Sequence, residues 1–169
     1  MANVSRPFGL RPVKSIGASP MSSNAETFAI LAADGTATFV GDLVKSAGTS
    51  DANGVQAVIR AAADADLMTG VVVGFTPDYS NLSIPGQYRA ASTLRYAFVA
   101  VGQDIVYEIN ATAATVIADI GLNVGLTYTA GSTSTGQSAL IANMATKATT
   151  NTLPLKIVGV VQRPDQDMS

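Results

Sequence analysis

The sequence predicts an all-β protein, a small β-barrel or β-sandwich with one short helix and an extended N-terminal arm. Two observations lead to this fold class. Short runs of β-branched, aromatic and aliphatic residues alternate with clusters of Gly, Asp, Asn and Pro, and segments with the residue spacing of an amphipathic helix are rare. Strands of this length at this spacing are typical of barrels and sandwiches.

The β-rich body is expected to span residues 26–169, and nine segments in it have strand character. Between two of them, Gly102-Gln103-Asp104 has the length and composition of a three-residue hairpin loop. The predicted strands are residues 27–31, 38–45, 55–60, 71–75, 94–101, 105–109, 126–129, 138–142 and 155–162.

The short helix is expected at residues 112–120, with Thr112 as its N-cap and Gly121 as its stop. Residues 61–67 are a second candidate, and both segments could instead be loops. A faint internal repeat relates residues 39–75 to residues 120–161, since each contains two strand-like runs followed by a Gly- and Val-rich third run.

Residues 1–25 differ from the body and are interpreted as an extended arm. Three prolines favour an extended, polyproline-like backbone. Burying three apolar side chains would contribute roughly 5–9 kcal/mol, whereas fixing about ten backbone residues costs roughly 10–20 kcal/mol. The arm is therefore expected to be mobile in the isolated protein and to order through backbone hydrogen bonds to a sheet edge and contacts with a partner. Its candidate interface residues are Arg6, Phe8, Leu10, Arg11, Val13 and Lys14.

Charged residues make up only 13% of the chain, against about 25% in typical soluble domains. Such a weakly charged surface favours a protein that is part of an assembly. The net charge of −2 gives no general attraction to nucleic acid or to anionic membranes. No apolar run approaches the roughly 18–20 residues of a membrane helix, and we expect a product made in the cytoplasm without a secretory signal.

Catalytic chemistry is not expected, because the chain contains no histidine and no cysteine and has only two glutamates. Four weaker candidates each have a simpler structural interpretation. Asp64 and Asp66 could bind Ca²⁺ or Mg²⁺ but fit a solvated turn, and Lys14-Ser15 lacks the rigid support that a Ser–Lys dyad needs. The other two candidates are a nucleic-acid patch of Arg89, Arg95 and Tyr96, which fit strand-face or interface charges, and a sugar site of tyrosines, which fit half-buried rim residues. The tyrosines are Tyr79, Tyr88, Tyr107 and Tyr128. We therefore expect no enzyme, no cofactor and no metal.

Four strings resemble small structural proteins of tailed bacteriophages, the capsid decoration or cement proteins. They are residues 6–12 (RPFGLRP), 39–42 (FVGD), 94–96 (LRY) and 153–165 (LPLKIVGVVQRPD). The resemblance implies a homotrimer that binds the major capsid protein on the outer surface of the phage head and stabilises it, with a terminal arm engaging the shell. The arm and the low charge agree with this picture independently.

Two alternatives remain open from the sequence. Another virion component, such as a head–tail or fibre-associated protein, would share the composition and differ in symmetry and copy number. A carbohydrate-binding β module would need clustered aromatic residues on a concave face, whereas this chain has no tryptophan.

Overall fold

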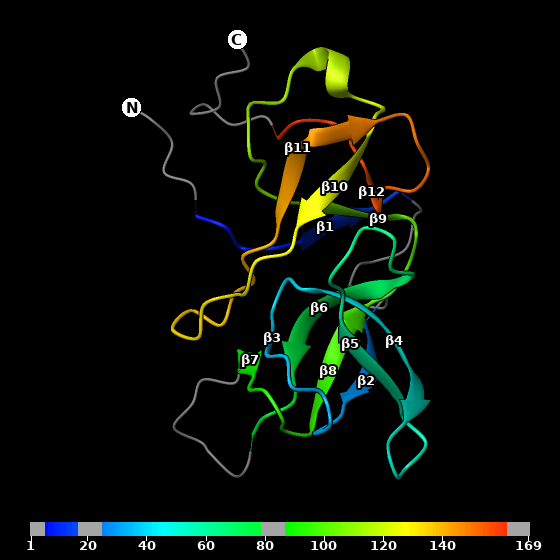
Figure 1. The fold of residues 1–169 in the computed structure, drawn as a ribbon, viewed down its shortest axis with the longest axis vertical. Coiled ribbons are helices and arrows are strands. Elements are labelled where there is room, and N and C mark those ends of the chain that lie inside the picture. Colours follow the sequence, from blue (N-terminus) through cyan, green and yellow to red (C-terminus); the bar gives the residue numbers. More distant parts are fainter. Residues whose placement is uncertain (1–5, 17–24, 79–86, 162–169) are drawn as a thin grey trace.

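The computed structural model describes residues 6–16, 25–78 and 87–161, and the predicted all-β fold is confirmed. Two β units lie one above the other in Figure 1. Within the described residues the strands are β1 (Arg11–Ser15), β2 (Ala25–Ile30), β3 (Thr38–Phe39), β4 (Leu43–Ser50), β5 (Gln56–Arg60), β6 (Met68–Phe75), β7 (Tyr88–Arg89), β8 (Arg95–Ala100), β9 (Ile105–Glu108), β10 (Asn123–Thr127), β11 (Ile141–Ala148) and β12 (Leu155–Lys156).

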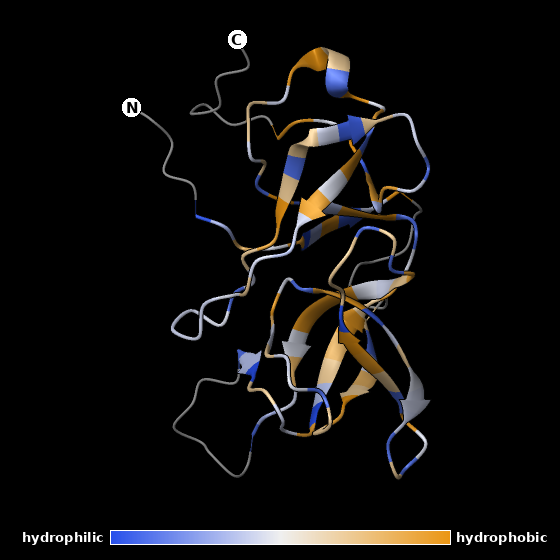
Figure 2. Ribbon diagram, viewed as in Figure 1, coloured by the Kyte–Doolittle hydropathy of each residue, from blue (hydrophilic) through white to orange (hydrophobic). Residues whose placement is uncertain are grey.

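The lower unit is a closed barrel with the strand order β2-β5-β4-β6-β8. Antiparallel ladders join most neighbours, and the barrel closes between β2 and β5 through one parallel pair, Ala29 with Ala57. Alternate residues of these strands point inward, as the period of two requires, and Figure 2 shows the apolar colouring of this unit. The barrel core consists of Phe28, Ile30, Val44, Val58, Val72, Phe75, Ala97 and Val99.

The upper unit combines a three-stranded sheet, in the order β11-β10-β12, with the two-stranded ribbon β1-β9. The chain leaving β9 joins the ribbon to the sheet, because Ala111 forms a parallel bridge with Ala142 of β11. A second apolar cluster lies between the two units. It contains Leu43, Ala61 and Val71 from the barrel side together with Leu10, Leu126 and Leu140 from the upper unit.

The two units share a strand arrangement that follows the internal repeat. In each, the first strand is central and pairs antiparallel with the second and the third, giving β5-β4-β6 and β11-β10-β12. Gly41 and Gly121 both have left-handed backbones, with φ of 91° and 96°, just before the central strand. The register of the first and third strands also agrees between the units. In the barrel, Leu43 pairs with Val71 and Val44 pairs with Gly70. At the equivalent positions of the upper unit, Asn123 pairs with Lys156 and Val124 pairs with Leu155.

Two local predictions are wrong. Gly102-Gln103-Asp104 does not close a hairpin, since β8 pairs with β2 and β6 in the barrel while β9 pairs with β1. The helix expected at residues 112–120 is reduced to a single 3-10 turn, Ile117–Asp119. Thr112 does not cap a helix. Its hydroxyl accepts a hydrogen bond from the Met144 amide, and its own amide donates to the Ala142 carbonyl, so the segment follows the edge of β11.

The expectation of a mobile arm is wrong for residues 6–16. β1 pairs antiparallel with β9 of the same chain, and Leu10 is buried in the cluster between the units. The sequence-based comparison of apolar burial with backbone ordering assumed that a sheet edge would be met together with a partner. Here β9 of the same chain supplies that edge, and its backbone hydrogen bonds to β1 add to the apolar burial. The rest of the predicted arm, residues 1–5 and 17–24, lies outside the described residues.

Across the described ranges, no helix is long and apolar enough to cross a membrane.

Candidate functional site

The six predicted interface residues follow one another along the N-terminal segment, and the structure divides them into buried and exposed groups. Leu10 is 2% exposed, and its amide donates to the Gly41 carbonyl at 2.9 Å. Phe8 is half-buried. Arg6, Arg11, Val13 and Lys14 are exposed, Val13 because it is the extra residue of a bulge in the β1–β9 ladder. The segment is therefore anchored through its apolar residues and presents cations outward.

Close backbone packing fixes the entry of this segment. Gly9 has a φ of 72°, and a Cβ placed on it would lie 2.6 Å from the Gly41 carbonyl oxygen and 2.6 Å from the Ser138 Cβ. Only glycine fits both the left-handed backbone and this contact. Asn110 adds a side-chain hydrogen bond of 2.7 Å to the Arg6 carbonyl. Residues 6–10 are thereby held against the body before β1 begins.

The two exposed arginines of the segment differ in their surroundings. Arg11 forms an ion pair with Glu108 of β9, and its guanidinium lies over the Phe8 ring at 5.3 Å from the ring centroid. Arg6 and Lys14 form no ion pair within the described part of the chain. We refer to Arg6, Lys14 and the exposed Val13 as the cationic strip.

A broad groove of about 1550 Å³ lies mainly in the upper unit and reaches the barrel, since residues 67–71 and Leu43 also line it. On one side is β12 with residues 157–161, and on the other is the β1–β9 ribbon. Its floor is aliphatic, formed by the cluster Val124, Ala142 and Met144 and by the half-buried Ile109, Leu155 and Ile157. We refer to it as the β12 groove.

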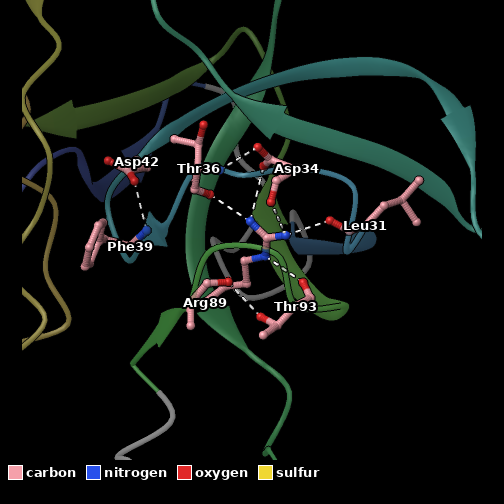
Figure 3. Close-up of polar contacts among 8 residues, drawn as sticks. Leu31, Asp34, Thr36, Phe39, Asp42, Arg89 and Thr93 are labelled. Carbon is pink, nitrogen blue, oxygen red and sulfur yellow. Dashed lines mark hydrogen bonds and ion pairs between the residues drawn. The ribbon is translucent and has the colours of Figure 1, made fainter.

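The nucleic-acid patch considered as a weaker candidate does not form, because its arginines are structural. Arg89 is fully buried, and its guanidinium donates to the carbonyl oxygens of residues 31, 34, 36 and 93 at 2.6–2.8 Å and to the Asp34 carboxylate at 3.4 Å (Figure 3). These five contacts use all five guanidinium N–H groups. Arg95, 8% exposed, donates to the carbonyls of Thr76 and Tyr88 and lies over the Phe75 ring. Neither is free to bind a phosphate.

Asp42 is a fully buried carboxylate where three chain segments meet. One oxygen accepts a hydrogen bond of 2.5 Å from the Ser138 hydroxyl, and the other accepts one of 2.8 Å from the Phe39 amide. Burial raises the pKa of Asp42 to about 6, although these two hydrogen bonds and the positive charge of Arg60 lower it. The Ser138 hydroxyl also accepts from the Leu140 amide, so Asp42 joins the barrel to the segment before β11.

The two candidate metal ligands, Asp64 and Asp66, have separate structural roles. Asp64 accepts hydrogen bonds from the Leu126 amide at 2.9 Å and from the Tyr128 hydroxyl at 3.1 Å, so it joins the barrel loop to β10. Asp66 binds the Lys45 ammonium at 2.7 Å, which is the main reason why its pKa is lowered. No group of three potential metal-ligating side chains occurs in the described ranges.

The Lys14-Ser15 pair and the tyrosines do not form the sites considered from the sequence. The Ser15 hydroxyl donates to Asp104, which lies just before β9 at the end of the ribbon where Ser15 pairs with Ile105. Tyr88 stacks on Phe39 with ring centroids 5.4 Å apart, and the Tyr107 and Tyr128 hydroxyls donate within the chain. Tyr79 lies outside the described residues. The described tyrosines therefore line no common surface.

Comparison of the chain with family models, with curated proteins and with solved structures found no match.

The sequence analysis missed the β12 groove and the buried Asp42. Lining residues of the groove come from segments more than 100 positions apart, so no local pattern indicates it. For Asp42, the only local sign was its position between the apolar runs 38–40 and 43–44, where a carboxylate is unusual.

Proposed function

We propose that this chain is a capsid decoration protein of a tailed bacteriophage, which binds the major capsid protein on the outer surface of the head as a homotrimer. The resemblance of four short strings supports the proposal, and so does the scarcity of charged residues. An all-β body with a terminal segment held along its outside agrees with the same reading.

The observation that carries the proposal is the preformed cationic strip. A flexible arm loses conformational freedom when it binds, and this loss weakens the complex. In this chain β9, Gly41 and Asn110 already hold the segment against the body, with an extended backbone over β1. Arg6 and Lys14 are thus presented on a rigid element, where they can meet acidic groups of a shell with little further ordering.

Trimer formation would strengthen attachment by linking three strips. Once one strip is bound, the other two bind as intramolecular events at a high effective concentration. The attraction between exposed charges is screened over about 8 Å at physiological ionic strength. Attachment should therefore weaken as salt is raised.

The test is binding to phage heads assembled without the protein. The double variant Arg6→Gln/Lys14→Gln removes both cations of the strip, and we expect its binding to fall by about tenfold or more at low salt. Glu26→Gln serves as a control, because Glu26 is exposed on β2 of the barrel. Sedimentation of each variant checks that the trimer remains.

Two results would contradict the proposal. A wild-type chain that does not bind the heads excludes the decoration role. A double variant that binds as well as the wild type, with the same salt dependence, removes the strip as the attachment surface. The carbohydrate alternative has no supporting observation in the structure, since the described tyrosines are dispersed and engaged within the chain.

A further inference from the structure

The β12 groove is bounded by a sheet edge with unused backbone groups. Ile157 donates to the Leu122 carbonyl at 2.9 Å and accepts from the Gly121 amide at 2.8 Å, so its backbone is turned toward β10. Because successive residues of an extended chain direct their N–H and C=O groups to opposite sides, the groups of Lys156 and Val158, which flank Ile157, should face away from β10 toward the groove. Continued alternation would turn those of Val160 the same way. Within the described residues, β12 has no strand partner other than β10.

The closed barrel shows what occupies the equivalent edge in the other half of the chain. By the shared register, β6 corresponds to β12 and Val72 corresponds to Ile157. β6 pairs with β8 on its far side, with Val71 opposite Ala100 and Val72 opposite Val99. β8 places Ala97 and Val99 in the barrel core, and both are completely buried. Among the described residues of the upper unit, no strand takes this place next to β12.

The chemistry of the groove defines the missing strand. The floor is aliphatic, so the strand needs apolar side chains at alternate positions. Arg6 and Lys156 line the groove, and they favour a carboxylate on the incoming segment.

A second copy of this chain offers no such segment among its described residues. The connection between β4 and β5 projects from the body in Figure 1, but its sequence, Asp51-Ala52-Asn53-Gly54-Val55, is polar and turn-forming. The apolar strands of the barrel are already paired on both sides. The occupant is therefore expected to be a different polypeptide.

We propose that the β12 groove binds an extended segment of the capsid shell protein, which adds to the free edge of β12 and residues 157–161 as a β-strand. This inference rests on the proposed decoration function and adds a second contact to the cationic strip. The bound segment would place alternate apolar side chains on the groove floor and a carboxylate near Arg6 or Lys156.

The test uses proline to remove a donor from the free edge. Val158→Pro deletes the N–H that is directed into the groove, and proline is tolerated on a sheet edge whose N–H is not bonded within the chain. Val158→Thr is the matched control, because it keeps the N–H and a β-branched side chain at a position that is 55% exposed. With equal melting temperatures, we expect Val158→Pro to bind undecorated heads about tenfold more weakly and Val158→Thr to bind like the wild type.

Hydrogen exchange of the wild-type chain gives an independent measurement. The amides of Val158 and Val160 should exchange rapidly in the free protein and become protected on heads. Slow exchange of both amides in the free protein would mean that the edge is already paired, and would overturn the proposal. Equal binding of Val158→Pro and the wild type removes the groove contact alone, whereas a wild type that does not bind heads removes both proposals.

Discussion

Asp42 links the stability of the protein to pH. Its pKa in the folded chain is about 6, against an ordinary value near 3.8. The folded state therefore holds the proton more tightly than the unfolded state does. The contribution of the protonated Asp42 to stability is complete below about pH 4 and is lost as the pH rises through 6. Above pH 6 the free energy of unfolding is therefore about 3 kcal/mol lower than at pH 4 on account of this group.

Asp42→Asn tests this linkage. An asparagine can accept from the Phe39 amide and donate to the Ser138 oxygen, so it imitates the protonated carboxyl group. We expect the variant to match the wild type near pH 4 and to be more stable by about 1–3 kcal/mol near pH 7.5. Urea unfolding at both pH values measures the difference. The pKa values of Asp51, Asp66 and Asp119 are lowered in the folded chain, so protonation of these groups below pH 4 destabilises the protein. This effect is the same in the wild type and in the variant, and it cancels when the two are compared at one pH. A constant difference across pH would contradict the assignment to Asp42.

Buried polar residues are where the sequence was least informative. Arg89 appeared as a surface cation because its neighbours Tyr88 and Ala90 carry no sign of burial. Its carbonyl partners lie up to 58 positions away, and backbone carbonyls have no residue-type signature. Asp64 was interpreted as part of a solvated turn for the same reason, since its partners, Leu126 of β10 and Tyr128 just after it, are 62 and 64 positions distant.

At the scale of elements, β1 decides whether the N-terminal segment is an appendage or part of the core. Leu10 lies next to β1 and is 2% exposed, while Val13 within β1 is 47% exposed. We expect Leu10→Ala to lower the free energy of unfolding by about 2–5 kcal/mol and Val13→Ala to change it by less than about 0.5 kcal/mol. Chemical denaturation of the two variants measures both values. Equal, small effects would indicate that the segment is detached in solution.

The strands were largely predictable, and their partners were not. Alternation and turn residues are local, so most of the predicted strands overlap the observed ones, as at β2, β5 and β8. Pairing depends on which distant strand shares a core. β9 is separated from β8 by a short connection, yet its Tyr107 packs against the cluster between the two units, and β1 becomes its partner. Helix propensity at residues 112–120 lost to the exposed edge of β11, where Thr112 satisfies backbone groups.

At the scale of the whole molecule, the two units share one apolar cluster. Leu43 and Val71 from the barrel pack with Leu126 and Leu140 from the upper unit. Neither unit can expose this surface without losing buried apolar area, so we expect a single cooperative unfolding transition. Circular dichroism and tyrosine fluorescence should give coincident thermal curves. Leu126→Ala should shift both curves equally, and two separate transitions would contradict the shared core.

The pairing of β1 with β9 has a consequence for how the chain acquires its structure. Arg11 lies opposite Glu108, 97 positions further along the chain, although their strands are adjacent in the folded protein. Contacts of such long range form slowly, because a large loop must close before they contribute. During synthesis, β1 leaves the ribosome long before its partner exists, whereas the whole barrel, residues 25–100, is complete before β9 emerges. Leu10 can meet its barrel neighbours Leu43 and Val71 at that stage, but Leu126 and Leu140, which complete its cluster, do not yet exist. The incomplete cluster stays exposed until they emerge, and this interval is when a nascent chain is most exposed to association with its neighbours.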